Sequence, residues 1–258
     1  MVIIAHRIIW GALFLLVFLS IREHKNLITA LRVTYKQLGI LLISGLLVAS
    51  NWLMFVWAVT HDQILATSLG YFINPLVNIF LGMIFLHERL KTDQIIALII
   101  ALSATVFLGI YLGQPPWIAL FLAFTFGLYG LVRKTLNVKP IVGLFWETII
   151  LIVPAILYLV YFAPEIKFSG TNNTLYLLLF LAGLVTVLPL IGFNYAAKKL
   201  PLTLIGFLQY IAPSISFLIA VLYFGEPFNL GYKVAFSGIW IALLIISFSS
   251  LKRTNNKT

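Results

Sequence analysis

The chain has 258 residues, of which 62% are hydrophobic and only 9% are charged. A soluble domain carries about 25% charged residues, so this composition excludes an ordinary soluble protein and indicates a membrane protein. The net charge of +10 sits in short connectors instead of one basic stripe, which argues against nucleic-acid binding, and the absence of cysteine excludes disulfides and thiolate metal sites.

Apolar runs divide the chain into nine predicted membrane spans. A helix needs about 20 apolar residues to cross the hydrocarbon core, and lipid cannot satisfy the backbone of an open sheet. We therefore expect an all-α polytopic membrane protein, followed by a short basic tail at residues 251–258. In chain order the predicted spans cover residues 2–20, 37–57, 64–86, 95–112, 117–132, 141–163, 175–195, 203–224 and 230–250.

The chain contains the same membrane module twice. A shift of 138 residues (213 − 75) aligns the run that ends at Pro75 with the run that ends at Pro213, and Glu88 with Glu226. The two predicted copies cover residues 1–112 and 117–250. The span at residues 117–132 has no counterpart in the first copy, so the copies have four and five spans. We expect coding sequence upstream of Met1 to encode one further helix.

Lys and Arg residues indicate the orientation of the spans. They are concentrated in alternate connectors, and the rule that cytoplasmic connectors are the basic ones places the C-terminus in the cytoplasm. Equivalent connectors of the two copies fall on opposite sides, so the sequence predicts an inverted repeat. The basic segments are residues 21–36, 87–94, 133–140, 196–202 and the tail.

Several polar and aromatic motifs lie inside the predicted spans: His6-Arg7-Ile8-Ile9-Trp10, Asn51-Trp52-x-x-Phe55-x-Trp57, the runs Leu69–Asn78 and Gly127–Lys134, and Gly206-Phe207-x-Gln209-Tyr210-Ile211-x-Pro213. In these motifs the chain resembles the RarD-type proteins, which belong to the EamA branch of the drug/metabolite transporter superfamily. The resemblance extends over essentially the whole chain. It implies ten helices in two inverted repeats of five, cytoplasmic termini, and the transport of small metabolites. This sequence departs from that pattern by lacking the first helix.

Ionisable residues inside spans are costly, and they are therefore functional candidates. Arg7 lies next to His6 in the first span; one interpretation is attraction of an anionic substrate group, and the other is that Arg7 reaches to the headgroups. Glu147 is the only acidic residue well inside a span. It is a candidate for proton coupling, and the alternative is an ion pair with a basic residue such as Arg133. Glu88 and Glu226 are expected to stabilise the start of the next helix.

Amide and aromatic residues complete the predicted substrate cavity. Asn74 and Asn78 are four residues apart and share a helix face, and Gln209 and Tyr210 occupy the same level of the second copy. Pro75 and Pro213 are expected to kink their helices. The alternative to a solute-binding role is a purely structural one, in which the prolines kink the helices and the asparagines bond to the backbone of neighbouring helices. The full set of candidate cavity residues is His6, Arg7, Trp10, Asn51, Trp52, Tyr71, Asn74, Asn78, Tyr129, Glu147, Asn194, Gln209 and Tyr210.

These features favour a secondary transporter for a small metabolite or drug-like solute in the plasma membrane. The two inverted copies would expose a central site to each side in turn. No catalytic or phosphate-binding motif is present in the sequence, so we expect no enzyme activity, no cofactor and no bound metal. The expected partners are the solute and membrane lipid, without nucleic acid. A channel or a non-transporting scaffold or sensor remains the alternative.

Overall fold

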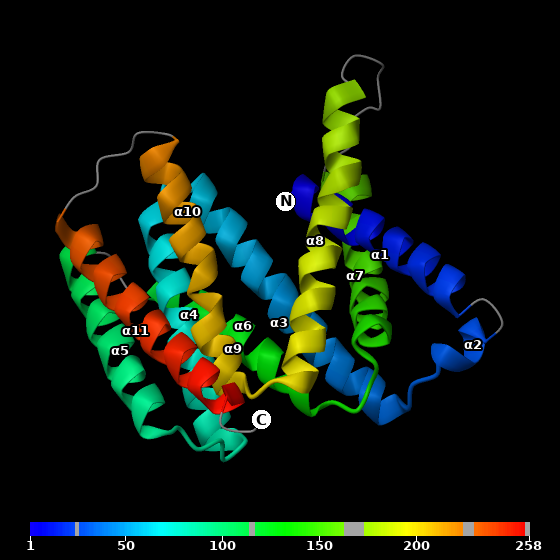
Figure 1. Cartoon of the computed structure of the whole chain (residues 1–258). Helices are drawn as coiled ribbons and strands as arrows, with labels where there is room; N and C mark the ends of the chain where they lie inside the picture. Colours follow the sequence, from blue (N-terminus) through cyan, green and yellow to red (C-terminus); the bar gives the residue numbers. More distant parts are fainter. Residues whose placement is uncertain (24–25, 114–116, 163–172, 224–229, 256–258) are drawn as a thin grey trace. The chain divides into compact units, whose positions relative to one another are not determined.

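The computed structural model describes residues 1–23, 26–113, 117–162, 173–223 and 230–255, and every element in them is a helix (Figure 1). The prediction of an all-α polytopic fold is confirmed. The helices are α1 (Val2–Arg22), α2 (Leu27–Ala30), α3 (Tyr35–Thr60), α4 (Ile64–Phe85), α5 (Thr92–Leu112), α6 (Trp117–Thr135), α7 (Pro140–Phe162), α8 (Asn173–Lys199), α9 (Leu202–Gln209), α10 (Ile211–Leu222) and α11 (Leu230–Asn255).

Within the described ranges, eight helices are long and apolar enough to cross a bilayer, namely α1, α3, α4, α5, α6, α7, α8 and α11. They correspond to eight of the nine predicted spans. The helix α11 continues into the segment that was expected to be a separate tail, and residues 256–258 of that tail lie outside the described part of the chain. The structure also contains α2, a single helical turn in a connector where no element was expected.

The ninth predicted span, residues 203–224, is divided into α9 and α10. The break lies at Tyr210, three residues before Pro213. Proline has no N–H to donate to the carbonyl of Gln209, and its ring collides with that carbonyl, so the helix cannot continue regularly through this turn. Pro75, by contrast, lies inside an uninterrupted α4. The helix is therefore divided near Pro213, whereas α4 is continuous through Pro75, and the expected kink at Pro75 stays a prediction.

The structure supports an internal repeat of the helices themselves. The starts of α1, α3, α4 and α5 precede those of α7, α8, α9 and α11 by the same interval, since 140 − 2, 173 − 35, 202 − 64 and 230 − 92 all equal 138. Three of these repeat-related pairs also pack directly against each other: α1 with α7, α4 with α9, and α5 with α11. The inversion of the repeat stays a prediction.

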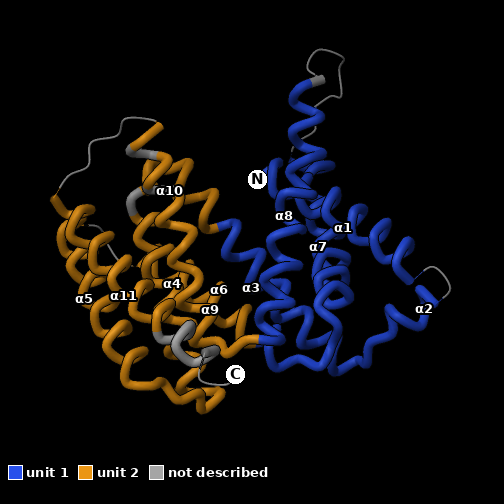
Figure 2. The backbone as a smooth tube through the Cα atoms, in the orientation of Figure 1, with its two compact units in different colours: residues 1–53, 132–199 blue, residues 54–131, 200–258 orange. Residues whose placement is uncertain are grey.

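The chain forms two compact units, shown in different colours in Figure 2. Unit 1 comprises residues 1–53 and 132–199, and unit 2 comprises residues 54–131 and 200–258. Each unit therefore combines helices from both predicted copies. Unit 1 holds α1, α7 and α8 with most of α3, and unit 2 holds α4, α5, α9, α10 and α11 with most of α6.

Small residues allow the helices of unit 2 to approach closely. Ala97, Ala101 and Ala104 of α5 lie in one buried cluster with Ala235 and Ala242 of α11. Aromatic residues complete this cluster, and the rings of Phe72 of α4 and Phe236 of α11 meet edge to face at 5.3 Å between centroids. Lipid is as apolar as the protein interior, so such packing contacts and hydrogen bonds between helices hold the unit together.

Candidate functional site: buried polar networks in each unit

An ion pair between Arg133 and Glu147 lies in the interior of unit 1. Both side chains are 1% exposed, and the Arg133 Nη1 and Glu147 Oε1 atoms are 3.4 Å apart. The Arg133 Nε donates to Asn194 Oδ1 at 3.2 Å, and its Nη2 donates to the Pro140 carbonyl at 2.7 Å. The Ser44 hydroxyl donates to Glu147 Oε1 at 2.5 Å. The network therefore joins α3, α6, α7 and α8.

This geometry bears on the two interpretations of Glu147, and its role in coupling stays a prediction. The structure contains the ion pair with Arg133 that was considered as the alternative to proton coupling. The sequence could suggest Arg133 as a partner, because it is the basic residue near the end of α6. It gave no sign of Ser44, which is one small hydroxyl among apolar residues of α3.

A glycine makes room for the arginine. A Cβ atom added to Gly143 would lie 2.0 Å from Arg133 Nη1 and 2.6 Å from Nη2. The guanidinium therefore lies directly against the backbone of α7, one turn before Glu147. No larger residue fits at this position while Arg133 keeps its place.

Two lysines of unit 1 stabilise the C-terminal ends of each other's helices. The ammonium group of Lys134 of α6 donates a hydrogen bond to the Ala197 carbonyl of α8 at 3.2 Å. Lys198 of α8 donates to the carbonyls of Lys134, at 3.2 Å, and Leu136. Carbonyls at a helix C-terminus lack partners within the helix and carry partial negative charge, so ammonium groups are favourable there.

Arg7 of α1 contacts two other helices of unit 1, α8 and α3. Its Nε donates to Thr186 Oγ1 of α8 at 2.7 Å, and its guanidinium carbon lies 4.8 Å from the ring centre of Trp52 on α3. His6 on the same helix is buried. Trp10, one turn further, packs edge to face on Phe180 at 5.0 Å. The structure thus brings the predicted residues Arg7 and Trp52 together, while the sequence did not suggest Thr186.

Unit 2 contains a cluster of three amides beside the two prolines. The Asn78 Nδ2 donates to Gln209 Oε1 at 2.7 Å and to the Asn74 carbonyl at 3.2 Å. The Asn74 Nδ2 approaches Gln209 Oε1 at 3.4 Å. Asn78 is fully buried, and its Oδ1 has no hydrogen-bond partner among the described residues. The prediction that these residues of the two copies lie at one level matches this arrangement.

The remaining candidates differ in accessibility. Tyr71 is 52% exposed and packs edge to face near Phe55, at 6.2 Å between ring centroids. Tyr129 and Tyr210 are fully buried, so a solute cannot reach them without a rearrangement. Asn51 is half-buried on α3, and Asn194 is a partner of Arg133 as described above.

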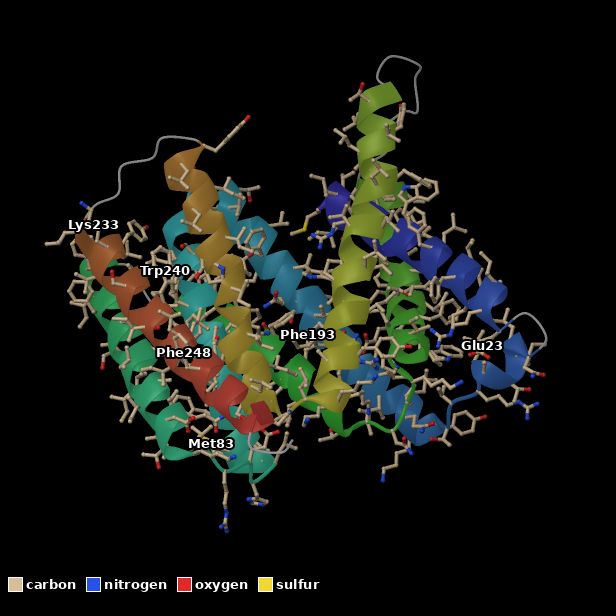
Figure 3. All side chains as sticks on the ribbon, viewed as in Figure 1. Glu23, Met83, Phe193, Lys233, Trp240 and Phe248 are labelled. Carbon is tan, nitrogen blue, oxygen red and sulfur yellow. The ribbon has the colours of Figure 1, made fainter. Side chains whose placement is uncertain are left out.

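The break at Tyr210 is supported by a hydrogen bond that the sequence did not indicate. The Ser214 hydroxyl donates to the Tyr210 carbonyl at 2.8 Å, and Trp240 of α11, labelled in Figure 3, donates its Nε1 to Ser214 Oγ at 3.0 Å. This chain of bonds connects α11 to the first turn of α10. The Tyr210 carbonyl also accepts the Ser214 backbone N–H at 3.2 Å, so the hydroxyl adds a second bond at the start of α10.

Glu88 stabilises a different helix from the one expected. Its Oε1 accepts from the Leu202 N–H and its Oε2 from the Thr203 N–H, both at 2.8 Å. These are the first two N–H groups of α9, which have no partner within the helix. The expectation that Glu88 serves the next helix, α5, is therefore wrong. Glu226, its predicted counterpart, lies outside the described residues.

The Glu88→Ala substitution should destabilise the protein by about 2 kcal/mol, since it removes two charge-assisted bonds from a helix start. Glu88→Gln should cost less, because one amide oxygen can still accept while its NH₂ group faces the other N–H. Thermal unfolding of the purified variants in detergent checks this order. Equal melting temperatures for wild type and Glu88→Ala would contradict the assignment.

Comparison with known proteins shows which family the chain resembles. The profile of the EamA-like transporter family matches residues 1–110. The uncharacterized transporter YojE of Bacillus subtilis is 42% identical over 253 residues, which are 97% of this chain and 85% of that protein. The protein RarD of Escherichia coli is also 42% identical, over 96% of this chain and 85% of its own length. A solved crystal structure with 16% identity matches 97% of this chain with a TM-score of 0.71, which concerns the fold alone.

The apolar helices and the buried polar networks between them define a polytopic all-α membrane protein of the transporter type. The similarity to the RarD proteins extends over nearly the whole chain. The chain belongs to the RarD-type branch of the EamA-like transporter family.

Proposed function

We propose that the protein is a secondary carrier that moves a small metabolite or drug-like solute across the plasma membrane. The observation that carries the proposal is the Arg133–Glu147 pair, two ionisable side chains buried inside a transporter-family fold. Ionisable groups at this depth are costly, and they mark solute or ion pathways in membrane proteins. A protein that only had to span the bilayer would gain nothing from them.

Each unit offers its own group of residues as candidates for contact with a solute. In unit 1 they are the part-buried Arg7 and its neighbour Trp52, which offer a cation and an aromatic face. In unit 2 they are Tyr71 and the half-buried amides Asn74 and Gln209. The fully buried Asn78 donates to both Asn74 and Gln209 and so holds these two amides in place. The solute therefore needs hydrogen-bonding groups and an apolar or planar part.

The mechanism proposed is alternating access between the two sequence copies, with the C-terminus in the cytoplasm. Its support is the common interval of 138 residues between helix starts and the pairing of repeat-related helices. Repeats of this kind give secondary carriers two conformations of similar energy. The distribution of Lys and Arg among the connectors supports the orientation. No catalytic step forms part of the proposal.

Transport by the purified full-length protein in liposomes tests this function. Candidate solutes are first selected by their effect on thermal stability, since a ligand that binds the native state raises the melting temperature. Uptake is then measured with and without the unlabelled solute inside. A carrier takes up labelled solute faster when unlabelled solute is present inside the liposomes. A channel shows no such stimulation, and the absence of uptake of every stabilising solute would favour a scaffold or sensor.

Glu147→Gln separates a coupling role from a purely structural one. Glutamine keeps the shape of the side chain and can still accept from Ser44, but it cannot carry a proton. If Glu147 couples transport to protons, uptake driven by a pH gradient is lost in this variant while solute exchange persists. The measurement is initial uptake and exchange in the same liposomes.

Asp62→Asn is the matched control for Glu147→Gln. Asp62 is an exposed acidic residue in the connector after α3, with a φ of 58° that asparagine tolerates. Solute uptake by the Asp62→Asn variant should keep the wild-type pH dependence. Wild-type pH dependence in Glu147→Gln as well would eliminate the coupling role and leave the carrier proposal intact.

A further inference from the structure

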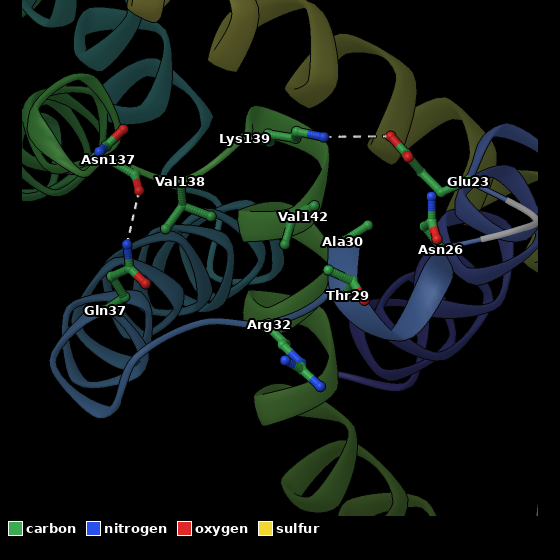
Figure 4. Close-up of a pocket in the computed structure, with 10 residues that line it drawn as sticks. All are labelled: Glu23, Asn26, Thr29, Ala30, Arg32, Gln37, Asn137, Val138, Lys139 and Val142. Carbon is green, nitrogen blue, oxygen red and sulfur yellow. Dashed lines mark hydrogen bonds and ion pairs between the residues drawn. The ribbon is translucent and has the colours of Figure 1, made fainter.

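A polar pocket lies at one end of unit 1, apart from the networks described above. It has a volume of about 530 Å³ and is formed by the connector between α1 and α3 and the connector between α6 and α7 (Figure 4). Five of its lining residues present hydrogen-bonding groups to the cavity and none is deeply buried: Asn26, Thr29, Arg32, Asn137 and Lys139.

Two hydrogen bonds hold the walls of this pocket in position, and an exposed ion pair spans them. The Trp146 Nε1 of α7 donates to the Leu31 carbonyl at 2.9 Å, which attaches the first connector to the helix behind it. The Gln37 Nε2 donates to the Asn137 carbonyl at 2.9 Å and joins the two connectors. An ion pair of 3.5 Å between Lys139 and Glu23 closes the far side. The pocket is therefore a defined cavity between fixed walls.

The charge and the hydrogen-bonding capacity of the lining favour an anion. Arg32 and Lys139 are cationic, and Glu23 is the one acidic residue of the lining. The Lys139–Glu23 pair is weak, because Lys139 is 67% exposed and such surface pairs contribute little. Among the described residues, the side chains of Asn26, Thr29 and Asn137 make no hydrogen bond with another protein group. These donors are available to a ligand.

We infer that this pocket binds a phosphate group. Arginine and lysine are the side chains that recognise phosphate oxygens, with arginine able to donate two parallel bonds. The pocket lies where spans end and connectors begin, which is the depth of lipid headgroups. The phosphate belongs either to an anionic phospholipid or to a free solute. The inference does not depend on the transport proposal, since it concerns other residues.

Binding to the full-length protein in detergent tests the inference. The probes are dioctanoyl phosphatidylglycerol, dioctanoyl phosphatidylcholine and inorganic phosphate, each followed by the shift in melting temperature across a concentration series. We expect Arg32→Gln to weaken binding of the effective probe at least about tenfold, because a charge-assisted bond is lost. Lys36→Gln is the matched control: Lys36 is an exposed cation in the first turn of α3, four residues after Arg32, and does not line the pocket.

The outcomes distinguish the sources of the phosphate. A response to phosphatidylglycerol that inorganic phosphate does not compete away, and that Arg32→Gln weakens, indicates a lipid headgroup. A response to inorganic phosphate itself, with the same loss in Arg32→Gln, indicates a free phosphate solute. The inference is overturned if no probe binds, if Arg32→Gln binds as wild type does, or if Lys36→Gln loses as much as Arg32→Gln. Both residues are exposed, so both variants are expected to fold.

Discussion

Glu147→Ala is expected to lower the free energy of unfolding by about 3 to 5 kcal/mol, because it leaves the Arg133 guanidinium buried without its partner. Arg133 is 1% exposed and keeps only the Asn194 and Pro140 acceptors after the substitution. The effect is measured as a loss of melting temperature and of monodisperse protein after extraction in detergent. Arg133→Ala should be similarly harmful, since it leaves the Glu147 carboxylate buried without its guanidinium partner.

A double variant tests whether the loss comes from the unpaired charge. Replacing both members of a buried pair with apolar residues of similar size is often neutral or stabilising. Arg133→Met combined with Glu147→Leu should therefore be more stable than either single alanine variant. A double variant that is less stable than both would mean that the two residues act independently and that the pair is not the source of the effect.

Gly183→Ala is the second substitution with a large expected effect, a destabilisation of about 3 kcal/mol from overpacking between two helix backbones. A Cβ atom at Gly183 of α8 would lie 2.6 Å from the Trp10 Cβ and 2.8 Å from the Gly11 nitrogen of α1. These are backbone atoms and the root of a side chain, which cannot turn away. The helices α1 and α8 would have to separate, and the contact of Arg7 with Thr186 would be disturbed.

The repeat supplies a control for Gly183→Ala at the equivalent position of the first copy. Gly45 lies 138 residues earlier (183 − 138), on α3 against α7. A Cβ atom there would be 3.7 Å from the Glu147 backbone, which is an ordinary contact. Gly45→Ala should therefore be neutral or slightly stabilising, because alanine is the better helix former. Equal losses in the two variants would show that helix separation is not the cause.

The fold was largely predictable from the sequence because lipid imposes simple rules. Long apolar runs in a bilayer must be helices, so the length of each run predicted eight of the spans. The split of the ninth span was less predictable. Pro75 and Pro213 look alike in sequence, yet only Pro213 is accompanied by a break, at Tyr210, where Ser214 and Trp240 form additional side-chain hydrogen bonds.

The candidate site was predicted in its ionisable members and missed in its partners. Arg7, Glu147, Asn78 and Gln209 stood out because polar groups are costly in an apolar span. Ser44 and Thr186 did not, since a small hydroxyl can bond to its own helix and is inexpensive in a membrane. The sequence also could not predict which N–H groups the Glu88 carboxylate binds. It depends on α4 packing beside α9, which begins more than a hundred residues later along the chain.

The reciprocal lysines have a practical consequence for experiments on membrane topology. Such experiments move Lys and Arg between connectors and ask whether the protein inserts the other way round. Lys134 and Lys198 each neutralise the end of a neighbouring helix, so deleting them would loosen α6 and α8 at the same time as it altered the insertion signal. Lys36 and Arg89 are exposed and are the cleaner positions at which to vary charge alone.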